Sequence, residues 1–484
     1  MENRIRFFNT LTRNVELFVP NEDGKVKMYT CGPTVYHYAH IGNLRSYIME
    51  DILEKTLRYV GYDVKRVMNI TDVGHLSSDA DTGEDKMLKG AKREHKTVME
   101  IAKFYTDAFL SDCNKLNIKI PDVVEPATNC IDEFIHMVSV LLDKGYAYVA
   151  GDNVYFDTSK LKDYYVFSSQ SEKELMVGVR DDVSEDTNKR NKADFVLWFT
   201  KSKFDNQELK WDSPWGVGYP GWHIECSVMA KRYLGDEIDI HAGGEDLIFP
   251  HHENEIAQSE AANGVPFAKY WMHNAFLNID NKKMSKSLGN FFTVRDISKE
   301  YDLQVLRFFM LSAHYRNPIN FSHDLMESAK NGLDRIVTAV GNLTHLAENA
   351  QAGAMTDEEK ALLEKTAEMT AKFEAAMEDD FNTADAIAAV FELVKFANSN
   401  SSAGNTAEYL NALKAKITAL TDVLGLITEK EAEMLDEEIE NLIAQRQQAR
   451  KDRDFAKADE IRDTLLAKGI VLEDTREGVR WKRA

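Results

Sequence analysis

The chain has few of the features that mark secreted, membrane-spanning or loop-rich proteins. Its 484 residues include 4 cysteines and 9 prolines, and no uninterrupted apolar run reaches the length of about 18 residues that a membrane helix needs. Four scattered cysteines are too few for a disulfide framework, so we expect reduced thiols or metal ligands. The first residues lack the apolar core of a signal peptide, which predicts a cytoplasmic protein with no membrane contact.

The chain also lacks an excess of positive charge, because 59 Lys/Arg stand against 80 Asp/Glu. The formal net charge is −21, which argues against a protein that holds nucleic acid through its overall field. Residues 446–484 differ, with 11 Lys/Arg against 8 Asp/Glu. They end in GVRWKR (478–483), where an aromatic residue between cations suits stacking on unpaired bases. A solvated helical hairpin with a packed Trp481 explains the same pattern equally well.

Strand-like and helix-like segments alternate near the N-terminus. Residues 28–36 form an apolar, β-prone run, 43–60 are typical of a helix, and 64–70 indicate a second strand. Such a βαβ unit predicts a right-handed parallel sheet. Two later apolar runs, 194–198 and 237–241, are assigned to the same sheet.

Changes in composition along the chain predict an α/β protein with several domains. Helical spacing of apolar residues begins near Leu325 and indicates a helix bundle. The predicted parts are a Rossmann-like catalytic domain (1–120 and 193–275), an inserted domain (121–192), a connector with a lysine-bearing loop (276–322), a mostly α-helical bundle (323–430) and a small C-terminal module (436–484).

Two motifs about 240 residues apart predict an ATP site. The segment KMSKS (283–287) places Lys283 and Lys286 in a short polar loop, which suits the phosphates of a nucleotide. The segment HIGN (40–43) lies where the first strand passes into the first helix. Backbone N–H groups and the helix dipole favour negative charge at such a crossing.

Cysteine, histidine and glutamate residues indicate a metal site. His251 and Glu255 are four residues apart after a proline that starts a helix, so one face carries both. Adding Cys31 and Cys226 gives a chemically sensible tetrahedral zinc set. The spacing leaves other readings open, because a neighbour could supply a ligand and either cysteine could be a buried apolar residue. The neighbours concerned are His252 and Glu253.

Several motifs, taken in order, resemble those of cysteinyl-tRNA synthetase, a class I aminoacyl-tRNA synthetase. They are CGPTVY (31–36), HIGN (40–43), GWHIEC (221–226), DIHAGGED (239–246), FPHHENE (249–255), KMSKS (283–287), DDFNT (379–383) and GIVLED (469–474). The resemblance runs from near the N-terminus to the C-terminus. One position departs from it, because the first signature often ends in a second histidine and Asn43 stands there instead.

The resemblance implies an ATP-dependent ligase that joins L-cysteine to tRNA(Cys), with one Zn²⁺ that binds the cysteine thiolate and Mg²⁺ accompanying ATP. It further implies an anticodon-binding C-terminal module and a monomer. The residues that it marks are Cys31, Cys226, His251 and Glu255 as zinc ligands; His40, Lys283 and Lys286 as catalytic groups; and Thr34, His40, Gly42, Asn43, Gly243, Gly244, Asp246 and Lys286 as ATP contacts. Trp222 is predicted as a substrate contact from its own position, close in the sequence to the ligand Cys226.

Alternatives remain for single residues and for the whole chain. Trp222 either closes over the substrate or packs in the core, and His223 and His241 either touch the amino acid or are structural. A cysteine:amino-sugar ligase shares these motifs but would not need the basic module. A degenerate synthetase kept as an RNA-binding protein would not need the lysines and the zinc ligands.

Overall fold

The computed structural model describes most of the chain in two compact units, Met1–Ile427 and Thr428–Ala484. The described residues are 4–73, 76–78, 82–167, 186–201, 208–280, 282–283, 291–350, 353–429, 436–451, 454–475 and 478–483. Among their helices, none combines the length and the apolar character needed to cross a membrane.

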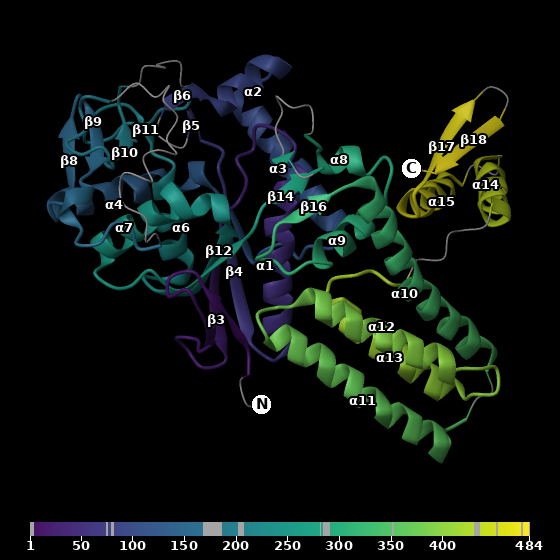
Figure 1. Cartoon of the computed structure of the whole chain (residues 1–484). Helices are drawn as coiled ribbons and strands as arrows, with labels where there is room; N and C mark the ends of the chain where they lie inside the picture. The colour runs from purple at the N-terminus through teal and green to yellow at the C-terminus, as the bar shows by residue number, and fades with distance from the viewer. Residues whose placement is uncertain are drawn as a thin grey trace. The chain divides into compact units, whose positions relative to one another are not determined.

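Five parallel strands form the central sheet of the larger unit, in the order β13-β12-β3-β4-β7. Figure 1 labels three of them, β12, β3 and β4. The helix α1 (Ile41–Tyr59) connects β3 to β4, so the predicted βαβ unit and the Rossmann-like fold class are confirmed. The first strand is shorter than predicted, because Gly32 and Pro33 follow it and proline has no N–H for the sheet. The strands are β3 (Lys25–Thr30), β4 (Asp63–Ile70), β7 (Val123–Pro126), β12 (Ile238–Gly244) and β13 (Ala268–Asn274).

Helices cover both faces of this sheet, so most positions of β3, β4 and β12 are buried whichever face they point to. Val26 and Met28 of β3 belong to the same buried cluster as Ile48 of α1. Tyr29, one position on, faces the opposite side and shares a cluster with Met229 of α6. The two helices on this second side are α6 (His223–Leu234) and α7 (Glu253–Asn263).

One strand lies elsewhere than the sequence predicts. β10 (Phe195–Phe199) pairs antiparallel with β9 (Asn153–Phe156) and β11 (Tyr219–Pro220), and β8 (Ala147–Ala150) completes a separate four-stranded sheet. The assignment of residues 194–198 to the parallel sheet is therefore wrong. Every residue of β10 is buried, and a strand covered on both faces has the same uninterrupted apolar sequence in either kind of sheet. The four-stranded sheet thus reaches beyond residue 192, where the sequence places the end of the inserted domain.

Short elements lead from the sheet to the bundle. A small three-stranded sheet contains the strand that precedes the lysine-bearing loop, and two helices follow that loop. The elements are β14 (Leu277–Ile279), β15 (Lys282–Lys283), α8 (Val294–Ile297), α9 (Leu303–Leu311) and β16 (Ile319–Phe321).

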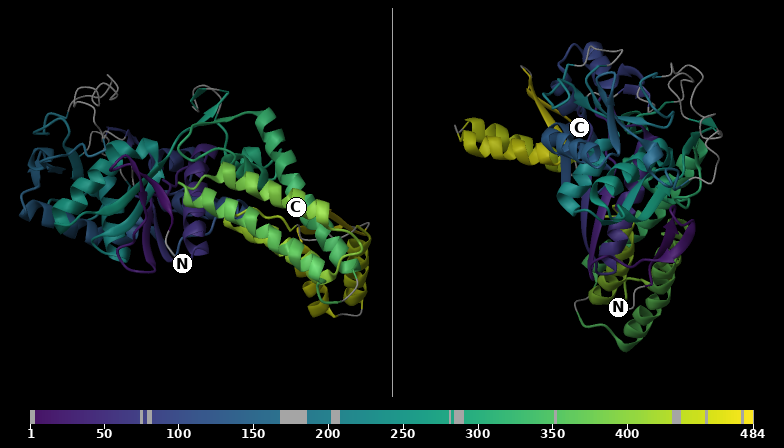
Figure 2. Two further views of the ribbon diagram at one scale, coloured as in Figure 1. Left: turned by 60° about the horizontal axis from the view of Figure 1, so that its bottom comes forward. Right: turned by 90° about the vertical axis from the view of Figure 1, so that its left-hand side faces the viewer.

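Four helices form the predicted bundle, and each packs against at least two of the others. They are the green to yellow-green helices that lie next to one another in the left view of Figure 2. Each begins after a Ser, Thr or Asn whose side chain accepts a backbone N–H from three residues further on, which stabilises the helix start. The helices are α10 (His323–Asn349), α11 (Asp357–Glu378), α12 (Thr383–Asn400) and α13 (Ala407–Val423).

Asp380, in the DDFNT motif between α11 and α12, ties the bundle to the catalytic part. Its carboxylate accepts hydrogen bonds from the Phe8 N–H at 2.8 Å, the Tyr315 hydroxyl at 2.6 Å and the Arg316 Nε at 2.6 Å. Asp380 and Phe381 have φ values of 58° and 51°, which few residues other than glycine and asparagine adopt. The DDFNT motif therefore joins the helix bundle to the N-terminal strand and to the segment around residues 315 and 316.

Arg307 of α9 forms a second junction. The guanidinium is buried and donates to the carboxylate of Asp51 at 2.6 Å and to the carbonyl oxygens of Leu424 at 2.8 Å and Leu116 at 3.0 Å. It lies directly against Gly425, which has a φ of 63°. These contacts join α1, α9 and the end of α13.

Replacing Gly425 by alanine should destabilise the larger unit clearly more than the same change at Gly264. Both glycines have positive φ, which costs alanine about 1 kcal/mol. A Cβ at Gly425 would collide with the Arg307 guanidinium, which its hydrogen bonds hold in place, whereas a Cβ at Gly264 would meet nothing within 4 Å. Overpacking of this kind costs a further 1–3 kcal/mol or so. Calorimetric melting of both variants measures the difference, and equal shifts would contradict the role of Arg307.

The smaller unit has its own core. Helices α14 (Asp436–Lys451) and α15 (Phe455–Ala467) pack together, and β17 (Ile470–Thr475) pairs antiparallel with β18 (Gly478–Arg483). The buried side chains are Ile439, Ile443, Ile461, Leu465 and Ile470. Trp481 lies on β18, but its side chain is outside the description.

Candidate active site and metal centre

His40 occupies the N-cap of α1 and forms a reciprocal capping box with Asn43. The Asn43 N–H donates to Nδ1 of His40 at 3.2 Å, and the His40 N–H donates to Oδ1 of Asn43 at 3.2 Å. Because a backbone N–H can only donate, Nδ1 is the acceptor, and a neutral imidazole then carries its proton on Nε2. Asn43, predicted as an ATP contact, thus also orients His40.

The residues after the lysine-bearing loop lie against this signature. The Ile41 N–H donates to the Phe292 carbonyl at 3.1 Å, and the Val294 N–H donates to the Ala39 carbonyl at 3.3 Å. The ring of Phe291 packs edge-on against His40, with centroids 5.2 Å apart. The HIGN motif and the end of the loop therefore meet in space. Lys283 ends β15 and its side chain is outside the description, and Lys286 falls wholly outside the described residues.

The other predicted ATP contacts lie at the carboxyl edge of the sheet, where open α/β folds bind ligands. Gly243 and Gly244 end β12, directly beside β3, and a side chain at Gly244 would collide with the carboxylate of Asp246. Thr34 follows β3 and pairs with Thr71 at the end of β4, and Gly42 lies in the first turn of α1.

Four predicted metal ligands converge at the same edge. Cys31 follows β3, Cys226 belongs to α6, His251 precedes α7, and Glu255 lies in its first turn. The Cys31 Sγ lies 3.8 Å from the Cys226 Sγ and 3.7 Å from Oε1 of Glu255. Nε2 of His251 lies 3.5 Å from the Cys226 Sγ and 2.9 Å from Oε1 of Glu255. Cys31 is 8% exposed and the other three at most 1%.

These distances fit the donor shell of a tetrahedral zinc ion. Zinc binds sulfur at about 2.3 Å and nitrogen or oxygen at about 2.0–2.2 Å, which separates the donors of a tetrahedron by about 3.3–3.8 Å. Three of the four donor distances given above lie in that range, and the His251–Glu255 pair is closer. Two sulfurs, one imidazole and one carboxylate are also ligand types that zinc favours.

The electrostatics of the cluster favour the ionised forms of Cys226 and Glu255 but not of Cys31. Burial raises the pKa of the Cys226 thiol, but hydrogen bonding with Cys31 and the nearby His251 outweigh it and lower the pKa to about 6. Burial also raises the pKa of Glu255, yet His241 and His251 lower it to about 2. Burial raises the pKa of the Cys31 thiol, and neighbouring Cys226 adds to this. Because metal binding requires deprotonated thiols, a cation here would displace the protons.

Further histidines hold the ligands in place. The His241 Nε2 lies 2.7 Å from Oε2 of Glu255, and the His223 Nδ1 lies 2.8 Å from Nδ1 of His251. Partners of this kind fix the orientation of metal ligands. His223 and His241 therefore contact the predicted ligands His251 and Glu255 from the side away from the other donors, as orienting partners. Trp222 stacks near His251, with ring centroids 4.1 Å apart, so this predicted substrate contact lies at the centre as well.

The structure distinguishes the two alternative metal ligands that the sequence left open, His252 and Glu253. The Nε2 of His252 lies 3.4 Å from the Cys31 Sγ, so His252 reaches the cluster. The carboxylate of Glu253 accepts the backbone N–H groups of Val166 and Phe167 at 3.0 Å and 2.9 Å instead.

Sequence reasoning did not find His273, whose Nε2 lies 2.8 Å from the Nδ1 of His252. His273 lies on β13, outside the histidine- and cysteine-bearing motifs of the sequence. The parallel pairing of β13 with β12 places it near the metal centre. No local spacing could have shown this.

The parallel sheet, the contact of the HIGN turn with the residues after the lysine-bearing loop, and the glycines at the carboxyl edge are features of a class I aminoacyl-tRNA synthetase. Family models agree. Residues 17–331 match the tRNA synthetases class I (C) catalytic domain, 372–428 match the DALR domain, and 432–481 match the cysteinyl-tRNA ligase anticodon binding domain. The chain belongs to the cysteinyl-tRNA synthetase family, which confirms the resemblance found in the sequence.

Relatives support this membership, and a solved structure shares the fold. A cysteine–tRNA ligase of Lachnospira eligens is 61% identical, covering 99% of this chain and 100% of the relative. One of Clostridioides difficile is 50% identical, with the same 99% and 100% coverage. A Mycobacterium tuberculosis methionyl-tRNA synthetase in complex with methionyl-adenylate has the same fold, with a TM-score of 0.56, 15% identity, and coverage of 83% of this chain and 89% of that one.

Proposed function

We propose that this chain is a cysteine–tRNA ligase that activates L-cysteine with ATP and transfers it to the 3′ end of tRNA(Cys). The observation that carries the proposal is the buried Cys31–Cys226–His251–Glu255 cluster, whose Cys31 follows the same strand, β3, as the His40 turn. A class I signature by itself indicates only that an amino acid is activated with ATP. A metal site with two cysteine ligands indicates which amino acid, because a metal that binds thiolates can also bind the thiolate of a cysteine substrate. Family membership agrees with both.

The first step needs fixed hydrogen-bond donors more than a protein nucleophile. A carboxylate oxygen of cysteine attacks the α-phosphorus of ATP, the bond to the β-phosphate oxygen breaks, and pyrophosphate leaves. Negative charge gathers on phosphate oxygens in the transition state, where positioned donors are most effective. The proposed donors are Nε2–H of His40 and the ammonium groups of Lys283 and Lys286. Mg²⁺ would accompany the ATP.

The nucleotide would lie along the carboxyl edge of the sheet. Gly42, Gly243 and Gly244 would let it approach the backbone, and Asp246 would bind its ribose or adenine. Thr34 and Asn43 would add polar contacts near the phosphates. Asn43 would do so through Nδ2, because its Oδ1 accepts the His40 N–H.

Zinc is the proposed metal, held by Cys31, Cys226, His251 and Glu255. When bound, the ion would supply a bond to a soft thiolate, which the protonated hydroxyl of serine does not form. The chain itself orients this centre: His241 positions Glu255, and His223 positions His251. Trp222 would close over the amino acid.

The transfer step gives the remaining parts their proposed roles. A hydroxyl of the terminal ribose attacks the adenylate carbonyl, AMP leaves, and the hydroxyl proton passes to solvent or phosphate. The inserted domain (121–192, extended by the strands up to residue 220) would bind the acceptor end. Region 276–322 would contact the stem, 323–430 would be the bundle, and 436–484 would read the anticodon. Cytoplasmic location and a monomeric state stay predictions.

Cysteine-dependent exchange of pyrophosphate into ATP, followed by acceptance of tRNA, tests the proposal. Exchange together with tRNA charging supports it. Exchange without charging would indicate the cysteine:amino-sugar ligase, and no exchange would contradict both enzyme functions.

Phe455→Ala should weaken tRNA binding by about tenfold, because stacking on one base contributes about 1–3 kcal/mol. Phe455 is the first residue of α15 in the smaller unit, and 61% of its surface is exposed. An aromatic ring so exposed is suited to an unpaired base. The matched control is Leu466→Ala, since Leu466 is 55% exposed at the other end of the same helix. Filter binding with tRNA(Cys) measures both, and equal losses would contradict a stacking role.

A further inference from the structure

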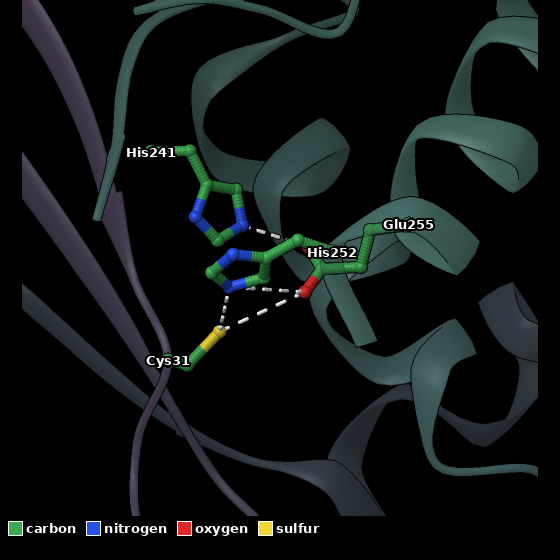
Figure 3. Close-up of side chains that lie close together, drawn as sticks. All are labelled: Cys31, His241, His252 and Glu255. Carbon is green, nitrogen blue, oxygen red and sulfur yellow. Dashed lines mark hydrogen bonds and ion pairs between the residues drawn. The ribbon is translucent and has the colours of Figure 1, made fainter. Parts of the chain in front are cut away.

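A second set of donors overlaps the first in the metal centre. Cys31, His241, His252 and Glu255 each offer a ligand atom, and these atoms all lie within 4.8 Å of one another (Figure 3). The Cys31 Sγ lies 3.4 Å from Nε2 of His252 and 3.7 Å from Oε1 of Glu255, and His252 lies 3.9 Å from the same oxygen. These separations are close to those of a tetrahedral donor shell, about 3.3–3.8 Å.

His252 is oriented as metal-binding histidines are. Its Nε2 points at Cys31 and Glu255, while its Nδ1 lies 2.8 Å from Nε2 of His273. The Nδ1 of His273 in turn lies 2.8 Å from the hydroxyl of Thr10. The contact with His273 fixes the ring of His252 through Nδ1, so that Nε2 faces the cluster. His223 fixes the ring of His251 in the same way. Both His241 and His252 are completely buried.

We propose that the protein can hold its metal ion in either of two donor sets that share Cys31 and Glu255. Cys226 and His251 complete the first set, and His241 and His252 complete the second. This inference rests on the proposed zinc site.

A double-mutant cycle on metal affinity tests the two sets without any activity measurement. Cys226→Ala removes a ligand of the first set only, and His252→Gln a ligand of the second set only. The two single variants, the double variant and the wild type are stripped of metal and titrated with Co²⁺ against a competing chelator. The control is Cys130→Ala, the same change at a buried cysteine away from both sets.

If the sets exchange, His252→Gln should reduce Co²⁺ affinity about tenfold more in the Cys226→Ala protein than in the wild type. A histidine that merely donates to the Cys31 sulfur would reduce both affinities by the same factor, and equal factors would overturn the inference. X-ray absorption of the Zn²⁺-loaded Cys226→Ala protein gives a second readout. Two imidazole ligands support the second set, and a single imidazole contradicts it.

Failure of the proposed zinc site gives a different result. A wild-type protein that binds neither Co²⁺ nor Zn²⁺ would contradict the metal site as a whole, and with it this inference. Wild-type binding with two sulfur ligands and a cycle without coupling would leave the proposed function standing and overturn only the second set.

Discussion

Lys286→Ala is expected to lower the rate of cysteine-dependent pyrophosphate exchange about 10²–10³-fold, because removing one positioned donor to a developing oxyanion has an effect of this size. Adenylate formation needs no protein nucleophile, so charge stabilisation on the phosphates is the main contribution that side chains can make. The expected change is in the rate at saturating ATP, with zinc content unchanged. A parallel loss of zinc would show that the lysine is structural.

The chain offers a matched control for this experiment. Lys282 lies on β15, next to Lys283, and is exposed. Lys282→Ala removes the same charge from the same region, so a general electrostatic effect would slow both variants alike. We expect exchange by this control to stay within about twofold of the wild type, since isolated surface charges contribute little.

Motifs that act through neighbouring residues were predictable from the sequence. The HIGN turn follows from a strand, a loop and a helix that are contiguous in the chain. Glu255 stands four residues after His251, so helical geometry alone puts both on one face. The capping box of Asn43 with His40 has the usual three-residue spacing but uses His and Asn in place of Ser/Thr and Glu/Gln, and the sequence indicated Asn43 only as a ligand contact.

Contacts that depend on the third dimension were not predictable. β10 has the apolar sequence of a buried strand, and nothing in that sequence selects β9 over the parallel sheet. His252 and Glu253 looked like equivalent alternatives, yet one points into the cluster and the other binds the backbone of residues 166 and 167. The direction of a side chain at a helix start depends on the turn before it, which spacing does not encode.

The junctions of Asp380 and Arg307 show the same limit. Asp380 lies between two helices and Arg307 in the middle of a short one, and their partners lie far away in the sequence. A buried charge must find partners to be tolerated, but the sequence does not show which charges are buried. Only the fold reveals that these two residues connect the catalytic part to the bundle.

Removing the metal is expected to abolish most of the preference for cysteine over serine. Packing alone separates near-isosteres by about 1–3 kcal/mol, whereas accurate aminoacylation needs a factor of about 10⁴–10⁵, or roughly 5.5–7 kcal/mol. The proposed zinc–thiolate bond would supply the difference. In its absence the ratio of the two affinities should fall below about 200, the upper limit of what packing provides.

Calorimetric binding of non-hydrolysable cysteinyl- and seryl-adenylate analogues to the holoenzyme and to chelator-treated protein measures this ratio directly. An alanyl analogue serves as the control, because its side chain has no group for the metal and its affinity should change little on chelation. If chelation weakens all three analogues alike, the metal supports the pocket rather than selecting the thiol. An unchanged ratio would place selectivity in the residues around the metal, with Trp222 and His223 the first to replace, since both pack against His251.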